Sequence, residues 1–202
     1  MIKVFKAPYI LRWIFPRRVW GFSSSKSIFL TFDDGPTKEL TSWILNLLRE
    51  KGIRATFFCV GSNASNNPEL MKELLADGHV VGNHTMRHET ARIGNKEQYM
   101  ASINEAQPFT SAKFFRPPHG KLPMTFTRKI GQNYKILMWS WLSYDFDKTV
   151  PIERILRKAE RQIKPGDIIV LHDNAKIEER AKELFPKLID LLLQKGYTFD
   201  VI

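Results

Sequence analysis

Short apolar runs alternate with longer amphipathic segments along most of the chain. The short runs are rich in aromatic and β-branched residues, which favours strands: Ser27–Phe32, Ala55–Val60, Val80–Asn83, Lys113–Arg116, Lys135–Ser140, Asp167–His172 and Thr198–Ile202. The segments between them show the spacing of helices: Glu39–Lys51, Pro68–Ala76, Lys96–Glu105, Thr125–Gln132, Pro151–Gln162 and Ile177–Lys195. This alternation predicts an α/β fold with a mostly parallel sheet, as a barrel or as an open doubly wound sheet.

Side chains that can perform chemistry follow the ends of these predicted strands. In a barrel and in an open parallel sheet alike, ligands bind beyond the carboxyl ends of the strands, so the placement defines one rim of the molecule. We therefore expect a single site at that rim, built from Asp33, Asp34, His84, Arg116, Asp145, His172 and Asp173.

Two adjacent carboxylates, Asp33 and Asp34, stand between a predicted strand and the turn-forming pair Gly35-Pro36. Neighbouring side chains on a strand point to opposite faces, so both can face one site only if the backbone turns there. A bound metal ion relieves their mutual repulsion best. For this motif taken alone, a solvated turn is the structural alternative.

Two histidines four residues apart, His84 and His88, supply further candidate metal ligands. On one turn of helix such a pair shares a face and can bind one ion, so we expect a helical turn here. The glutamate that zinc proteases use as a base after the first histidine is missing, but Asp33 is available. Two histidines and one carboxylate form a three-ligand site with open positions, which is typical of catalytic metal centres.

The stiff segment Arg116–Gly120 and a histidine at the end of the sixth predicted strand complete the rim. Two prolines fix the backbone and present the N–H of His119, which suits the stabilisation of an oxyanion. Arg116 can pair with a rim carboxylate. His172 follows an apolar run, so we expect it to be partly buried, as suits a general acid. For Arg116–Gly120 the structural alternative is a rigid loop with a salt bridge. For His172 it is a histidine buried in the core.

Composition sets the class of protein. The chain has 202 residues, of which 43% are hydrophobic and 26% charged, as in an ordinary soluble single domain. Its one cysteine, Cys59, excludes an internal disulfide and a cysteine-based zinc cluster, and its apolar neighbours predict a buried thiol. No apolar stretch reaches the roughly 18 residues of a transmembrane helix.

The net charge of +10 favours anionic surroundings, and residues 1–26 hold six lysines and arginines and no acid. Arg12 interrupts the apolar run there and no Ala-x-Ala site follows, so we expect no cleavable signal peptide and a cytoplasmic or peripherally membrane-associated protein. Because prolines break the segment, we expect this arm to pack on the domain, with contact to a membrane or an anionic cell wall as the alternative. Nucleic acid is not expected as a partner, since no binding signature is present.

Taken together, the motifs resemble those of the polysaccharide deacetylase (NodB-homology) family, carbohydrate esterase family four. The resemblance rests on Thr31–Pro36, His84–His88, Arg116–Gly120 and Leu171–Asp173, in this order and at these spacings. It implies a distorted (β/α)7 barrel resembling a TIM barrel. It also implies a metal-dependent catalytic domain over residues 27–202, preceded by the arm of residues 1–26, and a carbohydrate substrate.

The family's roles carry over residue by residue onto the metal and proton-transfer groups. The resemblance implies that Asp33 is the catalytic base and His172 the catalytic acid. It implies that Asp34, His84 and His88 hold one divalent metal ion, zinc before cobalt or nickel.

The resemblance also assigns the groups that contact the substrate. Arg116 looks like the arginine at the groove wall and is counted with the catalytic set. The backbone N–H of His119 looks like the oxyanion donor. Leu171 and Trp139 look like walls of the substrate pocket, with Leu171 beside the acetyl methyl group.

Three positions depart from the family pattern: His119, Leu142 and Phe146, the last in place of a tryptophan. His119 stands where the family usually has a tyrosine, which leaves the backbone donor but changes the side chain. Leu142 aligns with the aspartate that the family uses to tune its catalytic histidine. We therefore expect a lowered pKa for His172 and a pH optimum shifted downward, unless Asp145 or Asp173 substitutes.

The predicted function is removal of N-acetyl groups from N-acetylglucosamine-type sugars in peptidoglycan or chito-oligosaccharides, with release of acetate. Peptidoglycan is favoured because a basic chain suits an anionic wall. One alternative is a hydrolase of the same fold that acts on sugar acetyl esters or other non-peptide amides. Another is a non-catalytic carbohydrate-binding homologue, which only Leu142 favours. Non-haem Fe(II) oxygenases share the two-histidine, one-carboxylate set, but their β-rich fold disagrees with the alternation of strands and helices.

Overall fold

The structure, a computed structural model, describes residues 3–110 and 113–202. Eight strands in this part of the chain form one sheet, in the order β1-β6-β5-β4-β3-β2-β8-β7, and all their pairings are parallel. The strands are β1 Arg18–Val19, β2 Phe29–Asp33, β3 Thr56–Cys59, β4 Val80–Asn83, β5 Phe114–Phe115, β6 Lys135–Leu137, β7 Trp141–Leu142 and β8 Ile168–His172.

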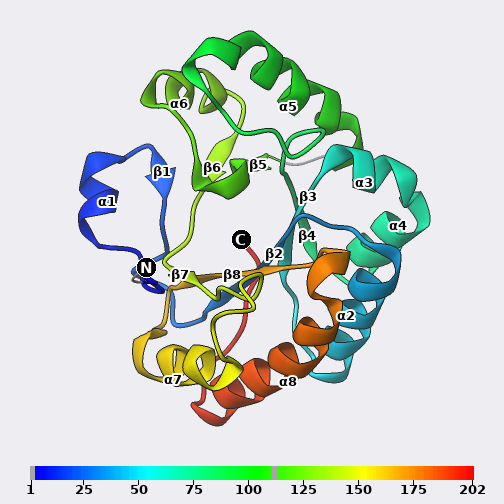
Figure 1. Cartoon of the computed structure of the whole chain (residues 1–202), viewed down its shortest axis with the longest axis vertical. Helices are drawn as coiled ribbons and strands as arrows, with labels where there is room; N and C mark the ends of the chain where they lie inside the picture. Colours follow the sequence, from blue (N-terminus) through cyan, green and yellow to red (C-terminus); the bar gives the residue numbers. More distant parts are fainter. Residues whose placement is uncertain (1–2, 111–112) are drawn as a thin grey trace.

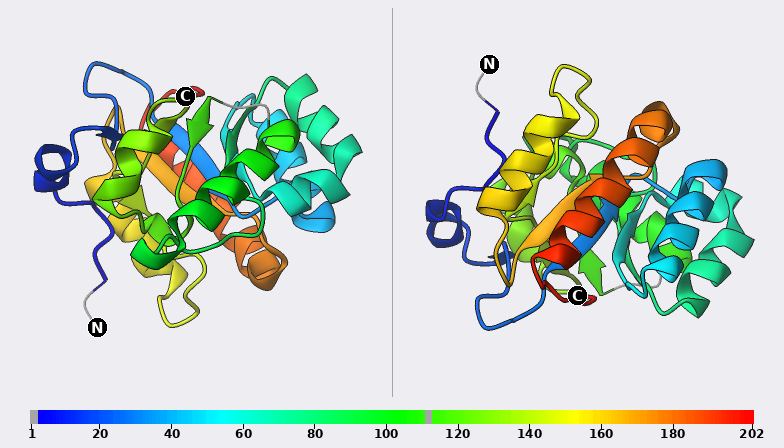
Figure 2. Two further views of the ribbon diagram at one scale, coloured as in Figure 1. Left: turned by 90° about the horizontal axis from the view of Figure 1, so that it is seen from above. Right: turned by 90° about the horizontal axis from the view of Figure 1, so that it is seen from below.

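The sheet curls into a distorted barrel, with the helices on its outside (Figure 1). Helices α2, α7 and α8 cover one side, and α5 and α6 lie on the opposite side (Figure 2). The α-helices are α1 Ile10–Ile14, α2 Lys38–Glu50, α3 Gly61–Asn66, α4 Pro68–Ala76, α5 Lys96–Thr110, α6 Met124–Ile130, α7 Ile152–Gln162 and α8 Glu178–Gln194. The predicted fold class, an α/β distorted barrel, is confirmed. Within the described residues β1 and β7 do not pair with each other, so strand pairing leaves the barrel open.

The C-terminal segment Thr198–Ile202, predicted as a strand, is not one. It makes a single bridge, between Phe199 and Ile28, just before β2. Strand β2 already pairs with β3 on one side and with β8 on the other, so it has no free edge to which a further strand could be added. The strand count of eight arises instead from the two-residue strands β1 and β7.

The core has two hydrophobic clusters. The larger one lies between the sheet and helices α2, α4, α7 and α8 and includes Phe32, Phe57 and Leu171. The smaller one includes Tyr99, Phe115 and Phe126, from the α5, β5 and α6 region. Cys59 is buried in the larger cluster, as predicted.

The N-terminal arm lies against both edges of the sheet. Phe5 is buried, and its carbonyl oxygen accepts a hydrogen bond from the Leu142 N–H in β7, at 2.9 Å. The Ala7 N–H donates to the Ser140 carbonyl, also at 2.9 Å. Further along the arm, β1 pairs with β6 at the other edge. No helix in residues 3–110 and 113–202 combines the length and the apolar character that crossing a bilayer requires.

Candidate active site

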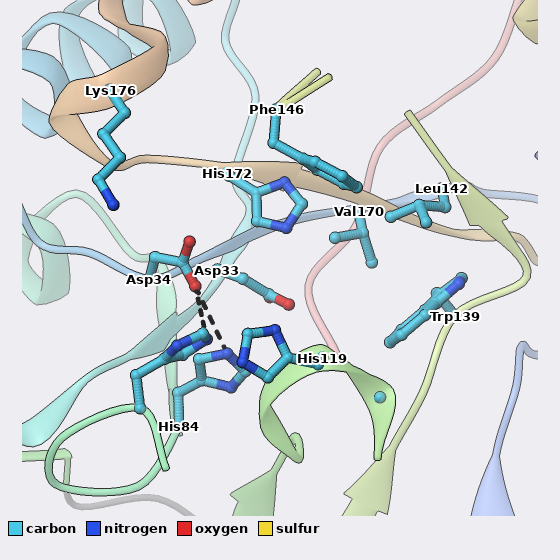
Figure 3. A pocket seen from close by; sticks show the side chains of 12 residues that line it. Asp33, Asp34, His84, His119, Trp139, Leu142, Phe146, Val170, His172 and Lys176 are labelled. Carbon is cyan, nitrogen blue, oxygen red and sulfur yellow. Dashed lines mark ion pairs between the residues drawn. The ribbon is translucent and has the colours of Figure 1, made fainter. Parts of the chain in front are cut away.

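A cavity of about 460 Å³ opens at the carboxyl ends of the strands (Figure 3). Seven of the residues predicted for the site line it: Asp33, Asp34, His84, His88, His119, Trp139 and His172. Gly120, Leu142, Phe146, Val170 and Lys176 also line it, although the sequence did not assign them to the pocket. The rim that the strand ends predict is therefore one continuous site.

The turn after β2 gives the two adjacent carboxylates different surroundings. Asp33 pairs in register with His172 of β8, so both side chains point to the inside of the barrel. Asp34 would point outward on a regular strand, but its φ of 86° turns the backbone back toward the cavity. The Gly35 N–H that follows donates to Oδ1 of Asp173 at 2.7 Å and holds the turn.

Asp34, His84 and His88 form a cluster that can hold a metal ion. Their ligand atoms all lie within 4.8 Å of one another. Oδ1 of Asp34 is 3.1 Å from Nε2 of His88 and 3.6 Å from Nε2 of His84, as the dashed lines of Figure 3 show. Ligands placed about 2.0–2.1 Å from a tetrahedral zinc ion lie about 3.3 Å apart, so these separations fit one ion.

The partners of these ligands fix them for metal binding. Nδ1 of His84 donates to the carbonyl oxygen of Arg116 at 2.8 Å, which leaves the Nε2 lone pair facing Asp34. The second oxygen of Asp34 accepts a hydrogen bond from the Asn174 amide at 2.8 Å. The donor set therefore presents a carboxylate and an oriented imidazole.

The helical turn predicted for His84–His88 is wrong, because this segment is a loop. Thr85 and His88 have positive φ values of 66° and 57°, which a right-handed helix excludes. The Thr85 N–H donates to the Asn83 side chain at the end of β4. The two imidazoles still converge, with ring centroids 5.0 Å apart, because the loop folds back on itself.

Arg116 pairs with Asp33, as predicted, but it does not form the wall of a groove. Its side chain is fully buried, and Nη1 donates to Oδ1 of Asp33 at 2.6 Å. The same nitrogen donates to the Thr31 hydroxyl, and Nη2 donates to the Met138 carbonyl. The planar guanidinium thus fixes Asp33 from beneath the cavity floor. It is a positioning residue rather than a contact for substrate.

Asp145, not residue 142, is the partner of His172. Nδ1 of His172 donates to Oδ1 of Asp145 at 2.7 Å, and the His172 backbone N–H donates to Oδ2 at 2.7 Å. Burial opposes protonation, but the charge and the hydrogen bond of Asp145 outweigh it and raise the pKa of His172 to about 9. The predicted lowering of this pKa does not occur, because Asp145 takes the place of the missing aspartate, which is the exception that the prediction stated.

Leu171 does not line the pocket. It pairs in register with Phe32, on the face of the sheet opposite to Asp33 and His172, and both belong to the larger hydrophobic cluster. The side-chain alternation of a strand brings Val170 to the cavity instead. Leu142 lines the cavity beside Val170, as Figure 3 shows. The apolar pocket wall is therefore Val170 and Leu142.

An aromatic wall and two polar groups complete the cavity. The indole of Trp139 lies against Gly120, where an added Cβ would come within 2.3 Å of the ring. Phe146 meets His172 edge-on, with ring centroids 5.1 Å apart. His119 has a positive φ of 58°, and in the described part of the chain no protein atom accepts a hydrogen bond from its backbone N–H. The Lys176 side chain reaches over the cavity toward Asp34 (Figure 3).

Fold and site together define a class: an α/β-barrel hydrolase whose cavity at the strand ends holds a metal-ligand cluster, a carboxylate and a histidine. Residues 22–137 match the family model described as polysaccharide deacetylase, which is more than half of the chain. The chain belongs to the polysaccharide deacetylase family.

Curated relatives match most of the chain. A peptidoglycan-N-acetylglucosamine deacetylase of Bacillus cereus is 33% identical over 187 residues, which cover 89% of this chain and 88% of that protein. A chitooligosaccharide deacetylase of Bradyrhizobium is 34% identical over 169 residues, which cover 78% and 75%. Among solved structures, the Bc1960 peptidoglycan N-acetylglucosamine deacetylase superposes with a TM-score of 0.83 at 27% identity, over 97% of this chain and 95% of that one.

Proposed function

We propose that this protein removes N-acetyl groups from N-acetylglucosamine residues of peptidoglycan and releases acetate. One observation carries the proposal: a carboxylate fixed by Arg116 and a histidine fixed by Asp145 enter one cavity beside the Asp34 cluster. This pairing of an acceptor and a donor of protons beside a site for a Lewis acid is what hydrolysis of an amide requires. The relatives named as N-acetylglucosamine and chitooligosaccharide deacetylases support it.

Zinc is the proposed metal ion, with cobalt and nickel as alternatives. Two imidazoles and one carboxylate suit zinc, and three protein ligands leave a position open for catalysis. When bound, such an ion would polarise the acetyl carbonyl and make a water molecule a stronger acid. The ligands are Asp34, His84 and His88, so Asp33 is left outside the cluster.

Asp33 is the proposed general base. Arg116 Nη1 donates to its Oδ1 at 2.6 Å, which fixes the carboxylate and orients its second oxygen. Asp33 accepts the proton of the water that attacks the acetyl carbon. Because Asp33 is only 4% exposed, it is shielded from bulk solvent.

His119 and His172 act on the substrate as the C–N bond breaks. The His119 N–H, which has no acceptor within the described protein, can donate to the oxyanion that develops on the acetyl oxygen. His172, with a pKa raised to about 9, carries a proton at neutral pH and delivers it to the leaving amine. The products are acetate and a free amino sugar.

Apolar residues beside His172 suit the acetyl methyl group. Val170 and Leu142 form an apolar wall of the cavity, and Trp139 offers a flat surface for a sugar ring. This arrangement gives Leu142 a role in substrate binding, so its presence does not by itself favour the alternative of a non-catalytic homologue.

Peptidoglycan is proposed ahead of chito-oligosaccharides because of the charge at the cavity. Lys176 lines it, and no carboxylate of the described residues lies within ion-pair distance of its ammonium group. An anionic strand can supply that partner, whereas a neutral chitin oligomer cannot. The net charge of +10 acts in the same direction.

Acetate release tests the proposal directly. The purified protein, loaded with Zn²⁺, is incubated with peptidoglycan fragments, chito-oligosaccharides and acetyl-esterified xylan, each with and without a chelator. We expect acetate from the first two, faster from peptidoglycan, and loss of release when the metal is chelated. Release from the ester alone would move the function to sugar esters. No release from any of the three would leave a non-catalytic binding protein.

A further inference from the structure

The short helix α1 carries apolar side chains on almost every side, and only part of them is covered. Leu11 and Phe15 pack against the smaller hydrophobic cluster of the body. Ile10, Trp13 and Ile14 face away and are 59%, 74% and 48% exposed. A helix that is apolar all round is usually buried in a core or in a membrane.

The exposed residues form one surface. Positions 10, 13 and 14 are neighbours on one face of a helix, and Tyr9, 67% exposed, stands next to them at the helix start. We call Tyr9, Ile10, Trp13 and Ile14 the α1 face. Contiguous apolar side chains on a soluble protein mark a contact surface more often than scattered ones do.

The arm that carries the α1 face is anchored on both sides. Before the helix, Lys3 and Lys6 pair with Asp147 and Asp167, and Phe5 is buried. After it, the Arg18 guanidinium donates to the Leu122 carbonyl at 2.7 Å. The arm that carries the α1 face is therefore already ordered, so binding of a partner to this face costs little conformational entropy.

The charge around the α1 face is positive. No acidic residue precedes Asp33 in the sequence. Arg12 lies over the Tyr9 ring at 5.1 Å, and Arg17 is exposed. In the described part of the chain neither arginine has a carboxylate within ion-pair distance, so no acidic side chain there neutralises their charge.

We propose that the α1 face docks this protein on the surface of an anionic phospholipid bilayer. Trp13, Ile10 and Ile14 enter the interfacial layer, where tryptophan and tyrosine are favoured, and Arg12 and Arg17 contact lipid phosphates. An anionic wall polymer would pair with the arginines but would leave the apolar residues in water. A two-fold contact with a second copy would bring the same cations together.

Vesicle co-sedimentation of the full chain tests this docking. We expect the protein to sediment with vesicles of phosphatidylglycerol and phosphatidylcholine at low salt, and to stay in solution with phosphatidylcholine alone. The double variant Trp13→Ser/Ile14→Ser should bind at least about tenfold more weakly, because two large apolar side chains that would be transferred from water into the bilayer are missing. Arg17→Ser should weaken binding about fivefold, and added salt should have the same effect.

The matched control is Ile93→Ser, which removes an 81% exposed isoleucine of the 3₁₀ turn Ile93–Asn95, away from the arm. It should bind vesicles like the parent chain. All variants should keep the parent melting temperature and the parent rate of acetate release from soluble chito-oligosaccharides. Failure of the parent chain to bind anionic vesicles, or equal binding by the double variant, would overturn the proposal. So would a dimer, seen by light scattering, that the double variant abolishes.

Discussion

Asp33 accepts a 2.6 Å hydrogen bond from a buried arginine, whereas the neighbouring Asp34 faces two imidazoles. The same functional group therefore stands in two environments, one residue apart. The positive φ of Asp34 is what separates them, because it directs the second carboxylate to the histidines without moving the first. At the residue scale, the chemistry depends on these partners more than on the residue types.

Asp33→Asn tests the role of the base with little change of shape. The amide oxygen can still accept from Arg116, so we expect the melting temperature to stay near that of the parent. The amide cannot take a proton from water, so kcat should fall by about 10²–10⁴. Acetate-release kinetics and a thermal melt measure both quantities. Full activity of this variant would remove Asp33 from the mechanism.

Asp145→Asn tests how His172 keeps its proton. In the parent protein His172 should lose its proton as the pH rises through about 9, so activity should decline on the alkaline side there. Without the Asp145 charge, burial of His172 should lower its pKa. The alkaline limb of kcat/KM should therefore move to lower pH. The rate at neutral pH should fall by about 10² or more.

The raised pKa of His172 also makes the free energy of unfolding depend on pH. Because folding raises the pKa of His172, its contribution is fully present below the unfolded pKa of about 6.5 and is lost as the pH rises through about 9. The stability difference between the parent and Asp145→Asn should therefore be largest below about pH 6.5. Urea unfolding at a series of pH values measures it. A difference that stays constant up to pH 10 would show that Asp145 acts by packing alone.

At the scale of elements, two loops bring the metal ligands together: the turn after β2 and the loop after β4. A ligand that binds only the folded state raises stability, by about 2.7 kcal/mol at 100 times its dissociation constant. Adding Zn²⁺ should therefore raise the melting temperature by about 5 °C or more. His88→Ala, which removes a partly exposed ligand, should lose most of this increase. Equal Zn²⁺ shifts in both proteins would place the ion elsewhere.

The turn after β2 also depends on a close approach that only glycine permits. A Cβ on Gly35 would lie 1.9 Å from Oδ2 of Asp173, whose other oxygen accepts the Gly35 N–H. Gly35→Ala must displace that carboxylate and break its bond to Thr41. We expect a loss of about 2–4 kcal/mol in the free energy of unfolding and a severe loss of activity. Gly94→Ala, with no atom within 4 Å of the added Cβ, is the matched control.

Long elements could be predicted from the sequence, whereas short ones and contacts across the fold could not. Strands β2, β4 and β8 are apolar runs with clear ends, and α4 was predicted at its observed bounds, Pro68–Ala76. A two-residue strand such as β1 has no periodicity to detect. The loop that joins His84 to His88 uses positive φ values that residue type does not announce.

Site residues were predicted correctly where the residue type itself indicates the chemistry. They were missed where strand geometry decides which side chain reaches the cavity. Asp34, His84 and His88 converge as predicted, although a loop and not the predicted helical turn brings the two histidines together. Val170, and not the predicted Leu171, lines the pocket because the register of β2 with β8 fixes the face to which each side chain points. The pairing of Asp145 with His172 joins a loop and a strand 27 residues apart, so sequence alone offered Asp145 only as one substitute among two.

At the scale of the whole molecule, the described part of the arm is bound to the barrel by several contacts. Strand order leaves the edges at β1 and β7, and the arm contacts both: residues 5–7 run beside β7, and β1 pairs with β6. Residues 1–26 were predicted as an arm that precedes the catalytic domain and packs on it. We propose further that the arm and the barrel unfold as one cooperative unit, since Lys3 and Lys6 also pair with Asp147 and Asp167 of the body.

Phe5→Ala measures how strongly the arm is coupled to the barrel. Phe5 is 2% exposed and packs against Trp141 and Tyr144, with ring centroids 5.9 and 5.0 Å away. Truncation of a buried phenylalanine leaves a cavity and costs about 3–5 kcal/mol. If the arm is integral, the urea midpoint of the whole protein should fall in a single transition, with fluorescence and circular dichroism coinciding. Val4→Ala, at an exposed neighbouring position, should leave the midpoint unchanged. A separate early transition in the Phe5 variant, with the main midpoint unmoved, would instead make the arm an independent element, because the barrel would then keep its stability without it.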